Sequence, residues 1–129
     1  ALAAFGSALG SGSAGMAAIG AWKKCYAQNK PAPFTLIVFV GAPLTQTIYG
    51  YILMNTLLGS TSPDWQVLGA GIFGGAAMGA SAFMQGKAGA AGADALGETG
   101  KGFGNYIMVL GLVETVALFV MVFLMGAMS

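Results

Sequence analysis

The sequence predicts an all-α membrane protein of four transmembrane helices, arranged as two tandem helical hairpins. Three observations support this fold class. The 129 residues are 57% hydrophobic and only 7% charged, four stretches are long and almost free of charge, and the chain repeats itself at an offset of 68 residues. A chain of this composition has too few polar side chains to surround a soluble core.

Four stretches exceed the roughly 20 residues that a helix needs to cross the hydrocarbon layer. They are residues 1–22, 31–63, 65–86 and 102–129, the last interrupted only by Glu114. Because lipid leaves backbone groups no outside partner, helices are expected throughout, including the β-branched run 34–40. The first stretch is expected to be a true span and not a signal peptide, since no basic residue precedes it and it takes part in the repeat.

The internal repeat needs no gap. A shift of 68 residues places Gln46 opposite Glu114, and it also pairs Phe5 with Phe73, Gly6 with Gly74, Ser13 with Ser81, Met16 with Met84, Leu44 with Leu112 and Thr47 with Thr115. We therefore expect a first hairpin over residues 1–60 and a second over 61–129, related by an axis along the membrane normal.

The two helices of each hairpin differ in kind. Small residues mark the first of each pair, at Gly6, Gly10, Gly12 and Gly15 and again at Gly71, Gly75 and Gly79. Such stripes allow helix backbones to approach closely. The other two helices are rich in bulky residues, so the sequence predicts two thin helices packed at the inside of an assembly and two bulky helices outside.

Lysines indicate the orientation in the membrane. Lys23, Lys24 and Lys30 follow the first helix, Lys87 and Lys101 bracket the expected loop between the third and fourth helices, and the loop 59–64 has none. Both lysine-bearing loops are expected in the cytoplasm and both termini outside. Net charge is only +1, so nucleic-acid binding is not expected. The single Cys25 excludes an internal disulfide and is expected to be reduced.

Glu114 is the unusual residue of the chain. A charge at the membrane centre costs at least ~2.5 to 3.5 kcal/mol. The chain has no Arg and its lysines lie near the ends of spans, so an internal ion pair is not expected. Glu114 must then bind a proton or a cation, or meet a basic side chain of another protein.

Other oxygen-bearing side chains are expected near Glu114. Thr45 and Gln46 lie at the middle of the second span, beside Pro43, which removes a backbone donor and leaves carbonyl oxygens open to a ligand. Gln85 adds a second amide if its helix continues through residues 88–96, with Lys87 extended to the membrane surface. One carboxylate with several neutral oxygens suits a hard monovalent cation, although hydrogen bonding between helices is the simpler explanation for any one residue.

Three segments carry a resemblance to a known family: P-L-T-Q-x-x-Y at 43–49, Q-G-K-A-G-A-A-G at 85–92 and V-E-T at 113–115. Together they resemble the K subunit, the four-helix rotor proteolipid of bacterial V-type ATPases. The resemblance implies a homo-oligomeric ring in the plasma membrane. ATP hydrolysis in a separate soluble head would rotate it, through central-stalk subunits, past a stator subunit that supplies an arginine.

The same resemblance implies a sodium site. Glu114 would carry the ion, with further ligands from the Thr45 hydroxyl, the Gln46 and Gln85 amide oxygens and the Ala42 main-chain carbonyl, and Tyr49 would hydrogen-bond the glutamate. Two positions depart from the family: Ala42, where a larger aliphatic residue is familiar, and Val116, where related chains can have an aromatic.

Several alternatives remain open from the sequence. The rotor could carry protons in place of sodium. A small four-helix proton-coupled exporter also has one membrane glutamate, but its acid is expected in the first helix beside aromatic residues, and a structural four-helix protein gives no reason to keep Glu114. An enzyme is not expected, because the chain has no His, no Cys pair, no nucleophile with a base and no phosphate-binding loop.

Overall fold

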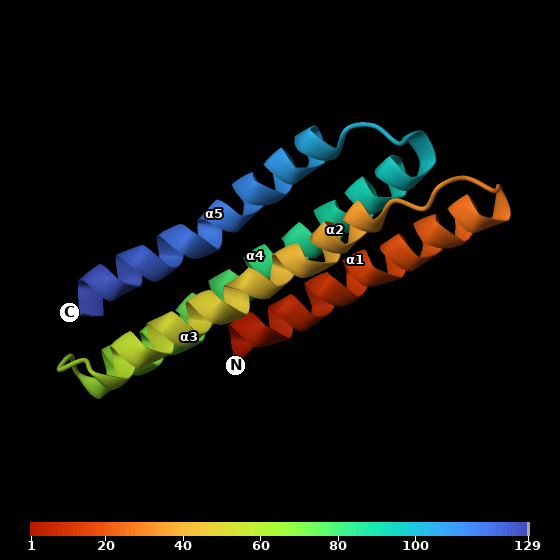
Figure 1. Ribbon diagram of the computed structural model, residues 1–129. Coiled ribbons are helices and arrows are strands. Elements are labelled where there is room, and N and C mark those ends of the chain that lie inside the picture. Colours follow the sequence, from red (N-terminus) through yellow and green to blue (C-terminus); the bar gives the residue numbers. More distant parts are fainter. Residues whose placement is uncertain (129) are drawn as a thin grey trace.

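The computed structural model describes residues 1–128, and every regular element in that range is helical. Four spans are long and apolar enough to cross a membrane, which confirms the predicted fold class (Figure 1). They are α1 (Leu2–Ala27), a composite second span, α4 (Asp64–Thr99) and α5 (Phe103–Met128); the composite span joins η1 (Phe34–Leu36), α2 (Ile37–Gly41), η2 (Ala42–Leu44) and α3 (Thr45–Leu58).

The four spans run side by side as an elongated bundle (Figure 1). The connections 28–33 and 100–102 lie at one end, and the connection 59–63 lies at the other. The N-terminus points toward the end with the connection 59–63 but stops short of it, with Leu2 beside Gly75 of α4. The most extensive contact joins α1 and α4, while α3 and α5 each pack on α4 and on one another. The helix α4 is therefore the centre of the bundle.

Glycines make the contact between α1 and α4 very close. A Cβ atom added to Gly6 would overlap the backbone of Gly79, and one added to Gly86 would overlap the backbone of Gly10. This confirms that the two thin helices pack tightly. Not all of the predicted stripe takes part, since a Cβ on Gly12 would meet no atom of the chain within 4 Å. Whether these helices line the inside of an assembly stays a prediction.

The helix α4 is longer than the charge pattern suggests. The sequence places a loop between Lys87 and Lys101, and this is wrong. The helix α4 runs without a break from Asp64 to Thr99, and its 36 residues span about 54 Å at 1.5 Å per residue. The Ala/Gly-rich stretch stays helical because its small residues bury against α1 and the second span, where Gly89, Ala93 and Leu96 are covered. Gly100, with φ 67°, ends the helix.

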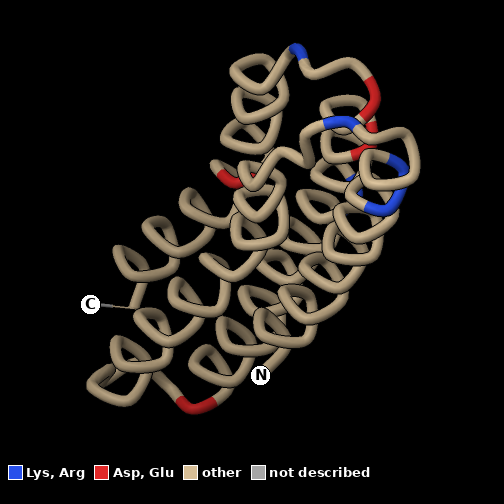
Figure 2. The backbone as a smooth tube through the Cα atoms, turned by 45° about the vertical axis from the view of Figure 1, so that its right-hand side comes forward, with Lys and Arg blue, Asp and Glu red and all other residues tan. Residues whose placement is uncertain are grey.

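Most charges gather at the end of the bundle that holds the connections 28–33 and 100–102 (Figure 2). Lys24 and Asp94 pair there at 3.2 Å, but both side chains are more than half exposed, so the pair adds little stability. Lys87 lies farther along α4, and its Nζ lies 4.9 Å from the centre of the Phe83 ring. This cation–π contact lies on the surface of α4, and the extension of Lys87 to the membrane surface stays a prediction.

The buried interior has three layers. One apolar cluster, at the lysine-rich end, contains Ala18, Ala21, Leu36, Phe39, Ala93, Leu96 and Leu110. A second apolar cluster, toward the opposite end, contains Ala3, Leu53, Met78, Ala117 and Met121. Along α4 and the second span, the buried polar residues Gln46, Ser81 and Gln85 fall between the two clusters. The apolar layers therefore separate this polar layer from both ends of the bundle.

Candidate functional site

The site begins at the break in the second span. Pro43 cannot donate a backbone hydrogen bond, and the chain passes through the short 3-10 segment η2 before α3 starts at Thr45. The main-chain carbonyl of Ala42 accepts from the backbone N–H of Thr45 and, at 3.0 Å, from the Thr45 hydroxyl. This turn places Thr45 and Gln46 together at the middle of the bundle.

The Thr45 hydroxyl is surrounded by oxygen atoms. Besides the Ala42 carbonyl, its Oγ1 lies 3.2 Å from the Gln46 Oε1 and in close hydrogen-bond contact with the Glu114 Oε1. A hydroxyl has a single proton to donate. Three acceptor oxygens therefore share this one hydroxyl proton, and of these three the Ala42 carbonyl also accepts from the Thr45 backbone N–H. A further proton or a cation would relieve the repulsion between the lone pairs of the Gln46 and Glu114 oxygens.

Glu114 comes to this cluster from α5 and is half-buried. Among residues 1–128 the recorded ion pair is that of Lys24 with Asp94, at the lysine-rich end. Within residues 1–128, no lysine forms an ion pair with Glu114.

Two buried glutamines continue the site away from Glu114. Gln46 is 0% exposed and Gln85 is 1% exposed. The Gln46 Nε2 donates to the Gln85 Oε1 at 2.9 Å, and the Gln85 Nε2 donates to the Leu110 carbonyl at 2.9 Å. Gln85 therefore lies at the depth of Glu114. This agrees with the prediction that Gln85 joins the site if its helix continues through residues 88–96, as α4 does. Gln85 reaches the site through Gln46, with its own oxygen turned toward that amide.

Ser81 is a residue that the sequence reasoning missed. Its Oγ donates to the Val113 carbonyl at 2.9 Å and accepts from the Gln46 Nε2 at 3.4 Å. Its position four residues before Gln85 places both side chains on one face of α4. This spacing could have indicated Ser81, but a serine in a small-residue helix is an ordinary packing residue.

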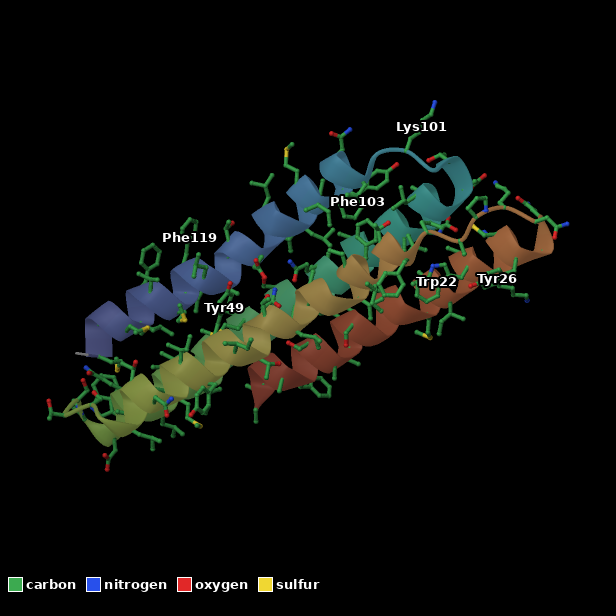
Figure 3. All side chains as sticks on the ribbon, viewed as in Figure 1. Trp22, Tyr26, Tyr49, Lys101, Phe103 and Phe119 are labelled. Atoms are coloured by element: carbon green, nitrogen blue, oxygen red, sulfur yellow. The ribbon has the colours of Figure 1, made fainter. Side chains whose placement is uncertain are left out.

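Tyr49 lies beside the site without a direct bond to it. It is half-buried and packs against the apolar cluster of Leu53, Ala117 and Met121, and Figure 3 shows it in the space between α3 and α5. Within residues 1–128, no hydrogen bond joins Tyr49 to Glu114. Tyr49 therefore belongs to the apolar layer next to the site.

The donor set defines the chemistry that the site can perform. A carboxylate, a hydroxyl, two amide oxygens and a main-chain carbonyl are hard ligands. The described residues form no cluster of three His, Cys, Asp or Glu side chains that would suit a transition metal. The arrangement suits a proton or a hard cation of low charge.

Fold and site together define a four-helix membrane protein with one acid at mid-height. Residues 68–125 match the family model of the C subunit of ATP synthase. This segment covers most of α4 and α5, with Ser81, Gln85 and Glu114, and its counterpart in the repeat is residues 1–57. No curated protein matches the chain.

The match has three consequences for the sequence predictions. Members of this family are non-catalytic rotor subunits, which confirms the prediction that the chain is not itself an enzyme. The match supports a rotor-ring, ion-translocating role and a multi-pass membrane location. Rings within ATPase complexes are the assembly of this family.

Proposed function

We propose that this chain is the rotor-ring subunit of a V-type ATPase and that it carries Na⁺ across the membrane at Glu114. The observation that supports this most is the oxygen cluster around Thr45, in which three acceptor oxygens share one hydroxyl proton. ATP hydrolysis would take place in a separate soluble head, and central-stalk subunits would transmit the rotation.

Glu114, Thr45 and Gln46 would hold the ion directly, with the Ala42 carbonyl at the base of the site. The Gln85 Oε1 keeps a lone pair after accepting from Gln46 and can turn it to the ion. One carboxylate neutralises one positive charge, so a monovalent ion leaves the occupied site without net charge. Na⁺ fits this set better than a proton, since a proton needs only the acid.

Rotation would follow from the cost of the empty site. An occupied Glu114 is neutral and can face lipid, whereas an emptied one is an anion that costs at least ~2.5 to 3.5 kcal/mol at mid-membrane. An arginine of the stator subunit would offset this cost at one place in the ring. Release and loading of the ion would therefore be confined to the stator.

Carbodiimide modification of Glu114 tests the sodium site. The reagent reacts with protonated, lipid-accessible carboxyls, so labelling of the purified protein in liposomes should fall as pH rises. Added Na⁺ should protect Glu114, and the protection should strengthen with pH because the ion competes with a proton. Mass spectrometry of the labelled peptide gives the rate, and Glu114→Gln is the control that should take no label at this position.

Two results would change the proposal. Labelling that follows pH but ignores Na⁺ would leave the rotor role and replace the ion by H⁺. Labelling that responds to neither would contradict the ion-carrying role of Glu114. Transport by the assembled ATPase should be lost in Glu114→Gln while the ring still forms.

A small proton-coupled exporter is the second candidate. It needs a substrate chamber beside its acid. The apolar groove between α4 and α5 is lined by Trp65, Phe73 and Phe123, among others, but not by Glu114. Separation of the groove from the acid favours the rotor.

A further inference from the structure

The hydrogen bonds that link Gln46, Ser81 and Gln85 to α5 have a fixed donor-to-acceptor direction, because they end at carbonyl oxygens of α5. They end at the main-chain carbonyls of Leu110 and Val113, which lie four residues and one residue before Glu114. A carbonyl oxygen accepts hydrogen bonds and never donates. Each side chain that meets one of these carbonyls must therefore direct a donor toward α5.

This requirement fixes the Gln85 amide. Its Nε2 must face the Leu110 carbonyl, so its Oε1 faces Gln46. It also fixes the Ser81 hydroxyl, whose one proton goes to the Val113 carbonyl and leaves only lone pairs for Gln46. Both α4 side chains therefore present acceptors to the same amide nitrogen.

Gln46 is oriented in turn. Its Nε2 meets the two acceptors from α4, so its Oε1 points to Thr45 and the Glu114 cluster. With the amide reversed, two N–H donors would face the cluster and the Oε1 would face the Gln85 oxygen. A reversed amide would repel a cation, and the Gln85 oxygen would lose its donor in a fully buried place.

We infer that Ser81 is a positioning residue that fixes the Gln46 amide with its oxygen toward the ion, and so sets the preference of the site for a cation. Ser81 touches Gln46 and α5 and acts only through them. It is 6% exposed, so no water replaces its hydroxyl easily. The inference rests on the proposed sodium site and adds to it the residue that orients a ligand.

The repeat supplies a matched control. Ser13 is the counterpart of Ser81 at the offset of 68 residues. Its hydroxyl bonds to the Leu9 carbonyl of its own helix at 2.9 Å. Ser13→Ala thus removes the same group from the other thin helix without touching the site.

The test measures the Na⁺ concentration that half-protects Glu114 from carbodiimide, for the full chain in liposomes at one pH. Ser81→Ala should raise this concentration by roughly 3- to 10-fold, the effect of one lost buried hydrogen bond. Ser81→Thr, which keeps the hydroxyl, should stay close to the unsubstituted protein, as should Ser13→Ala. The labelling rate without Na⁺ and the thermal unfolding temperature are recorded for every variant.

Each outcome decides something. A raised half-protecting concentration in Ser81→Ala alone, with unchanged unfolding temperature and Na⁺-free rate, supports the positioning role. Equal protection in Ser81→Ala and the unsubstituted protein would overturn it while the sodium site stands. A lower unfolding temperature in Ser81→Ala would indicate that Ser81 acts only in packing. A raised half-protecting Na⁺ concentration in Ser81→Thr, which keeps the hydroxyl, would lead to the same conclusion. Absence of protection in the unsubstituted protein would overturn both the sodium site and this inference.

Discussion

At the scale of single residues, the site depends on which atoms face one another. Thr45 offers one proton to three oxygens, and Gln46 turns its oxygen to the same place. Neither arrangement follows from the residue types, because serine, threonine and glutamine each donate and accept. The excess of acceptors is what makes the place suitable for a cation.

Thr45→Val should weaken Na⁺ protection of Glu114 about tenfold. Valine has nearly the same volume as threonine, but it lacks the hydroxyl that binds the ion and that donates to the Gln46 and Glu114 oxygens. The half-protecting Na⁺ concentration in the carbodiimide assay measures this effect. Thr47→Val is the control, because Thr47 is exposed and lies on another face of α3. Equal effects of both substitutions would contradict a ligand role for Thr45.

At the scale of helices, the contact between α1 and α4 organises the bundle. The backbones meet at Gly6, Gly10, Gly79 and Gly86 without any intervening side chain. Close contact holds α4 in one register, which in turn keeps Ser81 and Gln85 opposite the second span. Bulky residues at these glycines would separate the helices and move the amides away from Gln46.

Gly6→Ala should therefore lower the stability of the detergent-solubilised chain by ~1 to 3 kcal/mol, because its new methyl would overlap the Gly79 backbone. Unfolding followed by circular dichroism in increasing denaturant measures the change. Gly12→Ala is the matched control in the same helix: it meets no atom within 4 Å and should be neutral or stabilising by up to ~1 kcal/mol. A loss of stability of similar size in both variants would contradict a specific role for the contact between Gly6 and Gly79, because helix propensity alone favours alanine at both positions.

At the scale of the whole molecule, the charges separate the two ends. Lys24, Lys30 and Lys101 lie with Asp94 at one end, and Asp64 lies at the other, where α4 begins. By the positive-inside rule, we expect the lysine-rich end in the cytoplasm. This orientation would direct the long end of α4 toward the soluble head of the proposed ATPase.

Single cysteines can test the orientation. In a Cys25→Ala background, Lys101→Cys should react with a membrane-impermeant maleimide only in inside-out vesicles, and Thr61→Cys only in right-side-out vesicles. Both positions are exposed, and the Cys25→Ala substitution removes the one native thiol of the chain. The reverse pattern would contradict the proposed orientation.

The sequence alone determined the membrane class, the number of spans and the exceptional place of Glu114. These features follow from hydropathy and charge, which are properties of a segment by itself. It also predicted close packing of the glycine-rich helices, though not which glycines take part. It misplaced the third connection because Lys87 resembles a membrane boundary when its helix is read without its neighbours.

The tertiary structure decided what depends on contacts between distant segments. The continuation of α4 to Thr99 rests on burial against α1, and the roles open to Ser81 and Gln85 rest on two carbonyls of α5. A glutamine or serine in a sequence has no fixed donor direction, and only the groups that face it across a helix interface assign one. The packing of the helices against one another therefore orients these polar side chains, so that the oxygens of Thr45, Gln46 and Glu114 meet.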